Sequence, residues 1–161
     1  MNKEYIASEY KRMHQAKQFP GRSLEKHLPE LKALVEEYNC QSLLDYGCGE
    51  AMHHRKPFLV GNTTLYDPYC EPYSRVPVGT FDMVICTDVM EHIPEQDVAR
   101  VIADLINYTD KVLFLAICTK PASKKFANGI NVHLTVQPAP WWDRLIDSFN
   151  IDGLKIVRHY S

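Results

Sequence analysis

The stretch SLLDYGCGE, residues 42–50, decides the fold that the sequence predicts. Ser42 to Tyr46 form a short apolar segment typical of a strand, which ends at Gly47, and Gly49 follows two positions later. Glycine has no Cβ, so a chain with two such residues at a strand end can turn sharply and approach a ligand closely. The stretch therefore predicts a ligand-binding turn directly after a buried strand.

Strands and helices are expected to alternate along the rest of the chain. Further strands are expected at residues 63–66, 81–86, 111–118 and 154–160, and helices at residues 4–17, 23–38, 96–107 and 141–149. This alternation predicts an α/β fold with a Rossmann-like, mostly parallel sheet flanked by helices. The 161 residues are expected to form one domain, 1–161, in which residues 1–22 are an N-terminal arm that could act as a lid.

Three details of the helices can be predicted from single residues. Ser23 is expected to cap the second helix, and Pro29 to delay or kink it. Pro57 is expected to interrupt the helix that follows the glycine turn.

The carboxyl ends of the strands are where a parallel sheet binds its ligand, near the point at which the strand order reverses. Asp45 lies just before the glycines, and Asp67 closes the next strand. A carboxylate at Asp67 can accept hydrogen bonds from both ribose hydroxyls of an adenosine. Met52 stands where the dinucleotide motif needs its third glycine, so a nicotinamide-binding protein is disfavoured.

Two motifs resemble those of a known enzyme family. LLDYGCGE resembles the first motif of the class I S-adenosylmethionine (SAM)-dependent methyltransferases, and FDMVICTDVMEHIPEQDV, residues 81–98, resembles their fourth-strand motif. The whole chain is similar to compact bacterial and phage methyltransferases of unassigned substrate, which share a YKxMH arm, DYGCG, YDP, CTDVxEHIPE and a late NxHxTVxPxxWW segment. The resemblance implies a reduced class I methyltransferase fold with SAM as cofactor.

The resemblance also implies which residues bind SAM. These are Asp45, Gly47, Cys48, Gly49, Asp67, Pro68, Tyr69, Thr87 and Asp88. Residues 45–49 would line the methionine end, Asp67 would hold the ribose, residues 68–69 would pack beside the adenine, and residues 86–88 would close over the sulfonium. The short segment after Asp67 offers no clear acid for the adenine amino group.

The candidate catalytic residues lie after the later strands. His133 is the first candidate for a general base, because an imidazole with an ordinary pKa of about 6.5 suits that work. Glu91 and His92, which follow the strand at residues 81–86, are further candidates. His133 could instead be a structural histidine bound to the backbone, and Glu91 and His92 could cap the helix that begins near Pro94. Of Trp141 and Trp142, at least one is expected in the core.

No metal site is predicted. The five cysteines are scattered without a CxxC pair, which is typical of reduced thiols in a cytoplasmic protein. The adjacent His53 and His54 are expected to be solvated rather than to bind a metal.

The expected function is SAM-dependent methyl transfer to an oxygen or nitrogen of a small-molecule acceptor. A formal net charge of −2 argues against a nucleic-acid partner, and no apolar run is long enough to cross a bilayer. A nucleic-acid or protein methyltransferase on the same core remains an alternative. A non-catalytic SAM-binding domain is another, because Ala51 replaces the third motif glycine. The chain is short for this fold and could leave apolar surface exposed, which a homodimer could cover.

Overall fold

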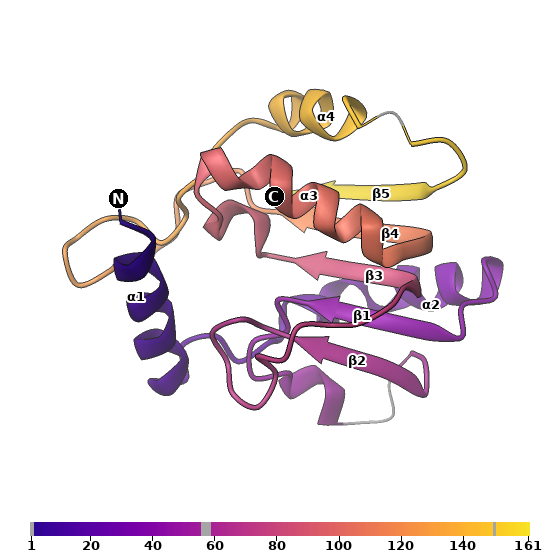
Figure 1. The fold of residues 1–161 in the computed structure, drawn as a ribbon, viewed down its shortest axis with the longest axis horizontal. Helices are drawn as coiled ribbons and strands as arrows, with labels where there is room; N and C mark the ends of the chain where they lie inside the picture. The colour runs from indigo at the N-terminus through magenta and orange to yellow at the C-terminus, as the bar shows by residue number, and fades with distance from the viewer. Residues whose placement is uncertain (1, 56–58, 150) are drawn as a thin grey trace.

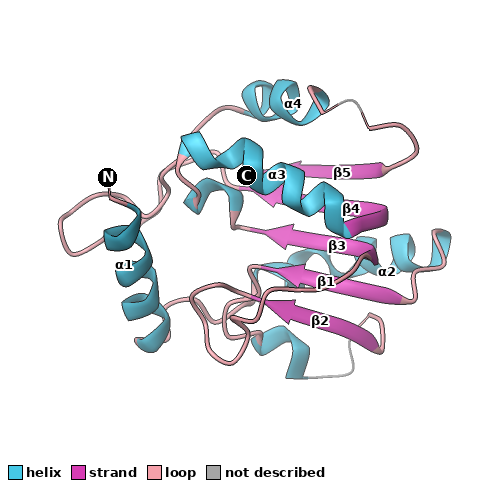
Figure 2. Ribbon diagram, viewed as in Figure 1, coloured by secondary structure: helices cyan, strands magenta, loops and turns pink. Residues whose placement is uncertain are grey.

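The computed structural model describes residues 2–55, 59–149 and 151–161. It is an α/β fold in which five strands form one all-parallel sheet in the order β2-β1-β3-β4-β5, with helices on both faces (Figures 1 and 2). The strands are β1 Ser42–Tyr46, β2 Asn62–Tyr66, β3 Phe81–Thr87, β4 Thr109–Ile117 and β5 Lys155–Tyr160. The predicted α/β class is confirmed. Within the described residues no helix has the length and apolar character needed to cross a membrane.

The centre of the sheet is built from the apolar runs of the sequence. Val84 of β3 pairs with Leu44 of β1 and with Leu113 of β4, and all three side chains are fully buried. Burying a side chain of this size contributes about 1.5–3 kcal/mol. The outer strands β2 and β5 are only half-buried, as expected at the edges of a sheet.

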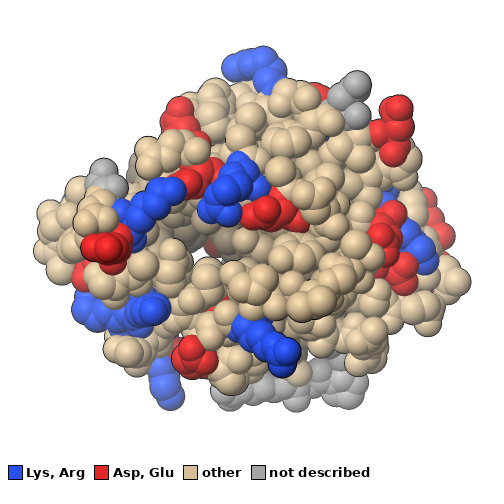
Figure 3. All heavy atoms as spheres, viewed as in Figure 1, with Lys and Arg blue, Asp and Glu red and all other residues tan. Residues whose placement is uncertain are grey.

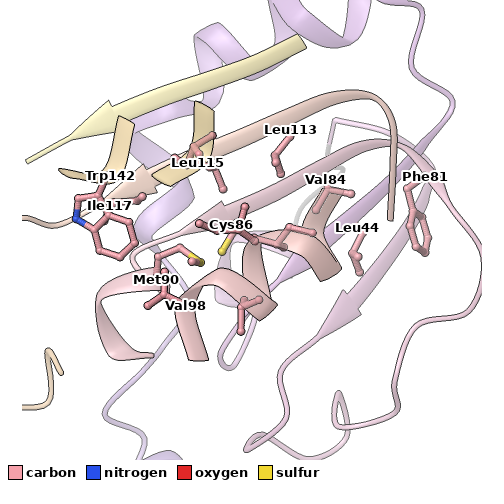
Figure 4. Close-up of a cluster of buried hydrophobic side chains, with 14 residues drawn as sticks. Leu44, Phe81, Val84, Cys86, Met90, Val98, Leu113, Leu115, Ile117 and Trp142 are labelled. Atoms are coloured by element: carbon pink, nitrogen blue, oxygen red, sulfur yellow. The ribbon is translucent and has the colours of Figure 1, made fainter. Parts of the chain in front are cut away.

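Two helices cover one face of the sheet: α3, Glu95–Tyr108, and α4, Ala139–Asp147. Figure 4 shows Val98 of α3 and Trp142 of α4 pointing toward the side chains of β3 and β4. Trp142 is fully buried, and its indole N–H donates to the carbonyl oxygen of Gln137 at 3.1 Å. Trp141 is half-buried beside it, so the expectation that at least one of these tryptophans belongs to the core is confirmed.

The other face is covered by α2, Leu28–Glu37, and by the 3₁₀ turn η1, Ser23–His27, that precedes it. Leu24 and Leu31 pack there on Met83 and Phe114. The expected cap at Ser23 is wrong, because no side chain caps either element and α2 begins only at Leu28. Pro29 lies in the first turn of α2, where its missing N–H costs nothing, and so the expected delay is confirmed.

The glycine turn is followed by the short 3₁₀ turn η2, Met52–Arg55, rather than by a full helix. The interruption that we expected at Pro57 lies outside the described residues.

The strand order reverses next to β1, which lies between β2 and β3. The chain leaves β1 for β2 on one side and returns to β3 on the other, so the connections diverge and leave a crevice beyond the carboxyl ends of these strands. The arm helix α1, Lys3–Gln15, lies across that edge of the sheet (Figure 1). The fold therefore places the arm directly over the expected ligand site.

Candidate functional site

A cavity of about 810 Å³ lies at the carboxyl edge of the sheet. Its walls come from the strand-end loops, from α1 and α3, and from the segment that follows β4. Figure 3 shows the face of the molecule hollowed between α1 and α3, with charged side chains of both signs along the α3 side. A cavity of this size is in the range used for small ligands and cofactors.

Most of the residues predicted to bind a cofactor meet in this cavity. Gly47, Gly49, Asp67, Pro68, Tyr69, Thr87 and Asp88 all line it. The candidate catalytic residues His92 and His133 line it as well. Asp45, Cys48 and Glu91 lie behind its wall and are buried. The sequence thus identified groups that are distant along the chain and adjacent in space.

The glycine turn is covered by the arm, which the sequence did not predict. The amides of Glu50 and Met52 donate to the carbonyl oxygens of Phe19 and Pro20, each at 3.0 Å, and the amide of His53 donates to Gly21 at 3.3 Å. The remaining amides of residues 47–53 donate to the carbonyl oxygens of Tyr66 and Cys48 and to the carboxylate of Asp67. Every N–H of the turn therefore has an acceptor within the protein, and none is left to cradle a pyrophosphate.

Glycine is required in this turn because the protein itself packs closely on it. At Gly47, with φ +84°, a Cβ would lie 2.3 Å from a methyl group of Val89. At Gly49, with φ +56°, a Cβ would lie 2.6 Å from the carbonyl oxygen of Phe19. The segment Phe19-Pro20-Gly21 could have been noticed in the sequence only as a turn, since its partner is about thirty residues away.

Asp67 is held rigidly at the end of β2. One carboxylate oxygen accepts from the amide of Gly49 at 3.1 Å, and the other accepts from the amide of Tyr69 at 2.9 Å. The Nε2 atom of His14 lies 3.6 Å from Oδ1 of Asp67. An oxygen that accepts one N–H keeps a second lone pair, which a hydroxyl group of a ligand can use.

The arm contributes aromatic rings to the cavity wall. Tyr10 of α1 stacks on Tyr69, with ring centroids 5.5 Å apart and an interplanar angle of 14°. Phe19 lies edge-on to His92 at 5.6 Å. Lys124, from the predicted basic loop, lies over the Phe19 ring at 4.6 Å and donates to the carbonyl oxygen of Gln18. The arm is therefore packed down over the cavity.

An acidic side chain that the sequence did not reveal also lines the cavity. Asp104 lies on α3, four residues after Arg100, and the two form an ion pair at 3.1 Å. The sequence offered no clear acid for the adenine amino group in the segment after Asp67. A polar residue of an amphipathic helix gives no signal of this kind until the helix is placed on the sheet, where α3 packs on β3 and β4.

Asp45 interacts with two histidines behind the glycine turn. Its Oδ2 atom lies 3.0 Å from Nε2 of His53 and 2.9 Å from Nε2 of His54. Burial would raise the pKa of Asp45, but the hydrogen bonds and charges of these histidines hold that pKa below its usual value. The expectation that His53 and His54 are solvated is wrong, because their side chains are only 4% and 7% exposed.

The candidate catalytic residues form a compact group. Burial lowers the pKa of His92 to about 3, and its Nδ1 atom donates to the carbonyl oxygen of Val132 at 3.1 Å. Burial raises the pKa of Glu91 to about 8. His133 donates from Nδ1 to the carbonyl oxygen of Lys120 at 2.6 Å, and its Nε2 atom lies 4.0 Å from Oε1 of Glu91.

The alternative in which Glu91 and His92 cap the following helix is wrong. These residues belong to their own 3₁₀ turn, η3, Met90–His92, and α3 begins at Glu95 without a side-chain cap. The backbone of Glu91 instead fixes the late segment, because its carbonyl oxygen accepts from Leu134 at 2.7 Å and from Thr135 at 3.0 Å.

The fold and the cavity define a Rossmann-like α/β protein with a ligand-sized cavity at the point where the strand order reverses. Comparisons of the chain with protein-family models, with curated proteins and with solved structures found no match.

Replacing Tyr10 with phenylalanine is expected to loosen the arm. The Tyr10 hydroxyl donates to the carbonyl oxygen of Val132 at 2.8 Å and lies 3.1 Å from that of His92. Tyr10→Phe should lower the free energy of unfolding by about 1–2 kcal/mol, because it leaves a buried acceptor without this donor. Tyr5→Phe on the same helix is the matched control and should cost less. Equal losses in urea unfolding would show that the Tyr10 hydroxyl does not anchor the arm.

Acidification is expected to destabilise the protein through His14. Burial lowers the pKa of His14, although the charges of Asp67 and Glu50 oppose this change. Below the unfolded pKa of about 6.5, the unfolded chain therefore binds more protons at this histidine than the folded one. The contribution of the neutral, buried His14 to the free energy of unfolding is present above that pH and is lost as the pH falls. The slope due to one such histidine is at most about 1.4 kcal/mol per pH unit.

Urea unfolding at pH values above and below about 6.5 tests the role of His14. In His14→Gln the free energy of unfolding should fall less steeply as the pH is lowered. The dependence that remains is due to His27 and His92, whose pKa values are also lowered by burial. An unchanged dependence would contradict the assignment to His14.

Proposed function

We propose that the protein binds SAM in the cavity at the carboxyl edge of the sheet and transfers its methyl group to an oxygen or nitrogen of a small molecule. One observation carries this proposal. Gly49, Asp67 and Asp88, which follow three different strands, converge on a single cavity at the point of strand-order reversal. That is where an open parallel sheet binds a nucleoside-containing ligand.

The adenosine would occupy the part of the cavity beside β2 and α3. Asp67 would accept hydrogen bonds from the ribose hydroxyls, since its two oxygens are oriented by the amides of Gly49 and Tyr69. Tyr66 and Tyr108 would provide apolar surface for the adenine, and Asp104 an acceptor for its amino group. This supplies from α3 the acid that the segment after Asp67 lacks.

The glycine turn favours a ligand without phosphate. Its amides from residue 47 to residue 53 all donate to acceptors of the protein. A dinucleotide would need some of those donors for its pyrophosphate, whereas SAM would not. This supports SAM over NAD for the same crevice.

The methionine end of SAM carries an amino group and a carboxylate, and the cavity offers a partner for each. Asp88, which follows β3, lines the cavity and would accept from the amino group. Arg22 and Ser23, which follow the segment that covers the glycine turn, also line it and would bind the carboxylate. These assignments give the amino group and the carboxylate of SAM an oppositely charged side chain each.

The transfer itself would depend mainly on positioning. The methyl carbon leaves the sulfonium, whose sulfur keeps the bonding pair, and bonds to a lone pair of the acceptor, which then loses its proton to water. Orienting two reactants in this way can supply about 7–11 kcal/mol of the barrier. His133 donates from Nδ1 to the carbonyl oxygen of Lys120, and its Nε2 atom lies on the side of the buried Glu91, so we assign it no role as a base.

Calorimetric titration with SAM, S-adenosylhomocysteine, NAD and ATP tests the proposal. The two adenosyl sulfur compounds should bind with micromolar affinity in a 1:1 complex, and the two phosphate-bearing nucleotides should bind at least about 100-fold more weakly, a difference of about 2.7 kcal/mol. Binding of NAD or ATP with the affinity expected for SAM would contradict it. So would the failure of SAM and S-adenosylhomocysteine to bind.

A non-catalytic SAM-binding domain is the second candidate. It is favoured by the state of the two imidazoles. His133 donates from Nδ1 to the carbonyl oxygen of Lys120 and its Nε2 atom lies on the side of the buried Glu91, and burial lowers the pKa of His92 to about 3, which makes it a weak base. The two candidates differ in turnover. An enzyme releases S-adenosylhomocysteine when SAM and a suitable acceptor are supplied, whereas a binding domain retains SAM unchanged across an acceptor screen.

A further inference from the structure

Three side chains able to bind a metal converge on one wall of the cavity. Glu91 belongs to the turn after β3, Cys118 follows the end of β4, and His133 belongs to the late segment. One ligand atom of each lies within 4.8 Å of the other two. Cys118 and His133 line the cavity, and Glu91 closes the group from behind.

The carboxylate of Glu91 is only weakly satisfied. The residue is fully buried, and among the described residues no hydrogen bond of ordinary geometry reaches either of its oxygens. The backbone of Glu91 and of Cys118 lies close enough to lower the pKa of this carboxyl group, but burial outweighs that effect and raises the pKa. A buried carboxylate with such weak hydrogen bonding is costly, so a group of this kind calls for a physical explanation. The carboxylate of Asp45, also close to two histidines, already forms hydrogen bonds with both at 2.9–3.0 Å and needs none.

The imidazole of His133 is oriented as a metal ligand would be. Its Nδ1–H donates to the carbonyl oxygen of Lys120 at 2.6 Å, which leaves the lone pair on Nε2. That atom lies on the side of Glu91, at 4.0 Å from Oε1. Histidines that bind a metal commonly donate the other ring N–H to a carbonyl oxygen in this way.

We propose that Glu91, Cys118 and His133 bind a divalent transition-metal ion, with zinc as the preferred ion, and that the fourth position faces the cavity. A thiolate, an imidazole and a carboxylate favour zinc over magnesium or calcium, which prefer oxygen ligands alone. Ligands of a tetrahedral zinc ion lie about 3.3–3.8 Å apart, given bond lengths of about 2.0–2.3 Å. The separation of 4.0 Å between His133 and Glu91 therefore requires only a small closing movement.

The open position would bind water or the heteroatom of an acceptor. A metal ion there would lower the pKa of that group, a task for which the methyl-transfer proposal has no side chain. The site itself does not depend on SAM, so it can be present even if the proposed function is wrong.

Titration of the metal-free full chain with Co²⁺ tests the site, because a thiolate ligand gives cobalt a near-ultraviolet charge-transfer band. The wild-type protein should show this band at one equivalent, and added Zn²⁺ should abolish it. Cys118→Ser should lose the band, whereas Cys70→Ser, which changes a cysteine outside the cluster, should keep it. The half-exposed position of Cys118 makes serine tolerable for the fold, which circular dichroism checks.

Glu91→Gln is the second variant and keeps the size of the side chain. It should weaken Co²⁺ binding at least about 10-fold, since a neutral amide replaces the anionic ligand. Absence of the band from the wild-type protein would overturn the proposal, and so would a band that survives in Cys118→Ser. Because these titrations contain no SAM, failure of the metal site and failure of the methyltransferase proposal remain distinguishable.

Discussion

Gly21→Ala is expected to lower the free energy of unfolding by about 3 kcal/mol or more. With φ +68°, Gly21 adopts a left-handed conformation, and its Cβ would lie 2.2 Å from the carbonyl oxygen of Cys48 and 2.7 Å from the amide nitrogen of Ala51. Both atoms belong to the backbone and cannot rotate away. The segment that covers the glycine turn would have to move, which would break the hydrogen bonds that it accepts from residues 50, 52 and 53.

Gly153→Ala is the matched control for this result. Gly153 is also left-handed, with φ +84°, but a Cβ there would have no heavy atom within 4 Å. This variant should therefore cost only the conformational strain, about 1 kcal/mol. Urea unfolding of both variants separates the two contributions. Equal losses would show that the contact between Gly21 and the glycine turn adds nothing to stability.

Asp67→Asn is expected to weaken SAM binding at least about 100-fold, which corresponds to about 2.7 kcal/mol. A hydrogen bond to a charged acceptor contributes about 1.5–3 kcal/mol, and the proposed ribose contact uses two of them. The amide can still accept one of the two backbone N–H groups that Asp67 binds, but it turns a donor toward the other. Some stability should therefore be lost as well, about 1–3 kcal/mol.

Asp110→Asn serves as the control for Asp67→Asn, since Asp110 accepts a hydrogen bond from Thr80 near the amino end of β4 and does not line the cavity. It should bind SAM as the wild-type protein does. Calorimetry of both variants, with circular dichroism to confirm folding, gives the comparison. A folded Asp67→Asn variant with wild-type affinity would remove Asp67 from the ribose site.

The sheet was predictable because the information that specifies it is local. Apolar runs such as residues 81–86 are long enough to mark buried strands, and Gly47 marks where the first one ends. The position of Asp67 at the end of β2 follows from the same pattern, since parallel strands bring their carboxyl ends to one edge. Cavity residues immediately after a strand were therefore found from the sequence.

The features that sequence reasoning missed depend on contacts between distant segments. The carbonyl oxygens of residues 19–21 cover the glycine turn, Asp104 reaches the cavity from the middle of α3, and Cys118 meets His133 beside Glu91. Local patterns carry no signal for such pairs. The errors at Ser23 and at residues 53–54 have the same origin, because tertiary packing determined whether each side chain caps a helix or interacts with Asp45.

A crystal structure of the protein in complex with S-adenosylhomocysteine tests the central claim most directly. We expect the ligand in the cavity at the carboxyl edge of the sheet, with both ribose hydroxyls within hydrogen-bond distance of Asp67 and the sulfur facing the turn that contains Asp88. Its amino acid part should contact Arg22 rather than the amides of the glycine turn, which already donate to acceptors within the protein. A ligand bound elsewhere, or a ribose without contact to Asp67, would contradict this account.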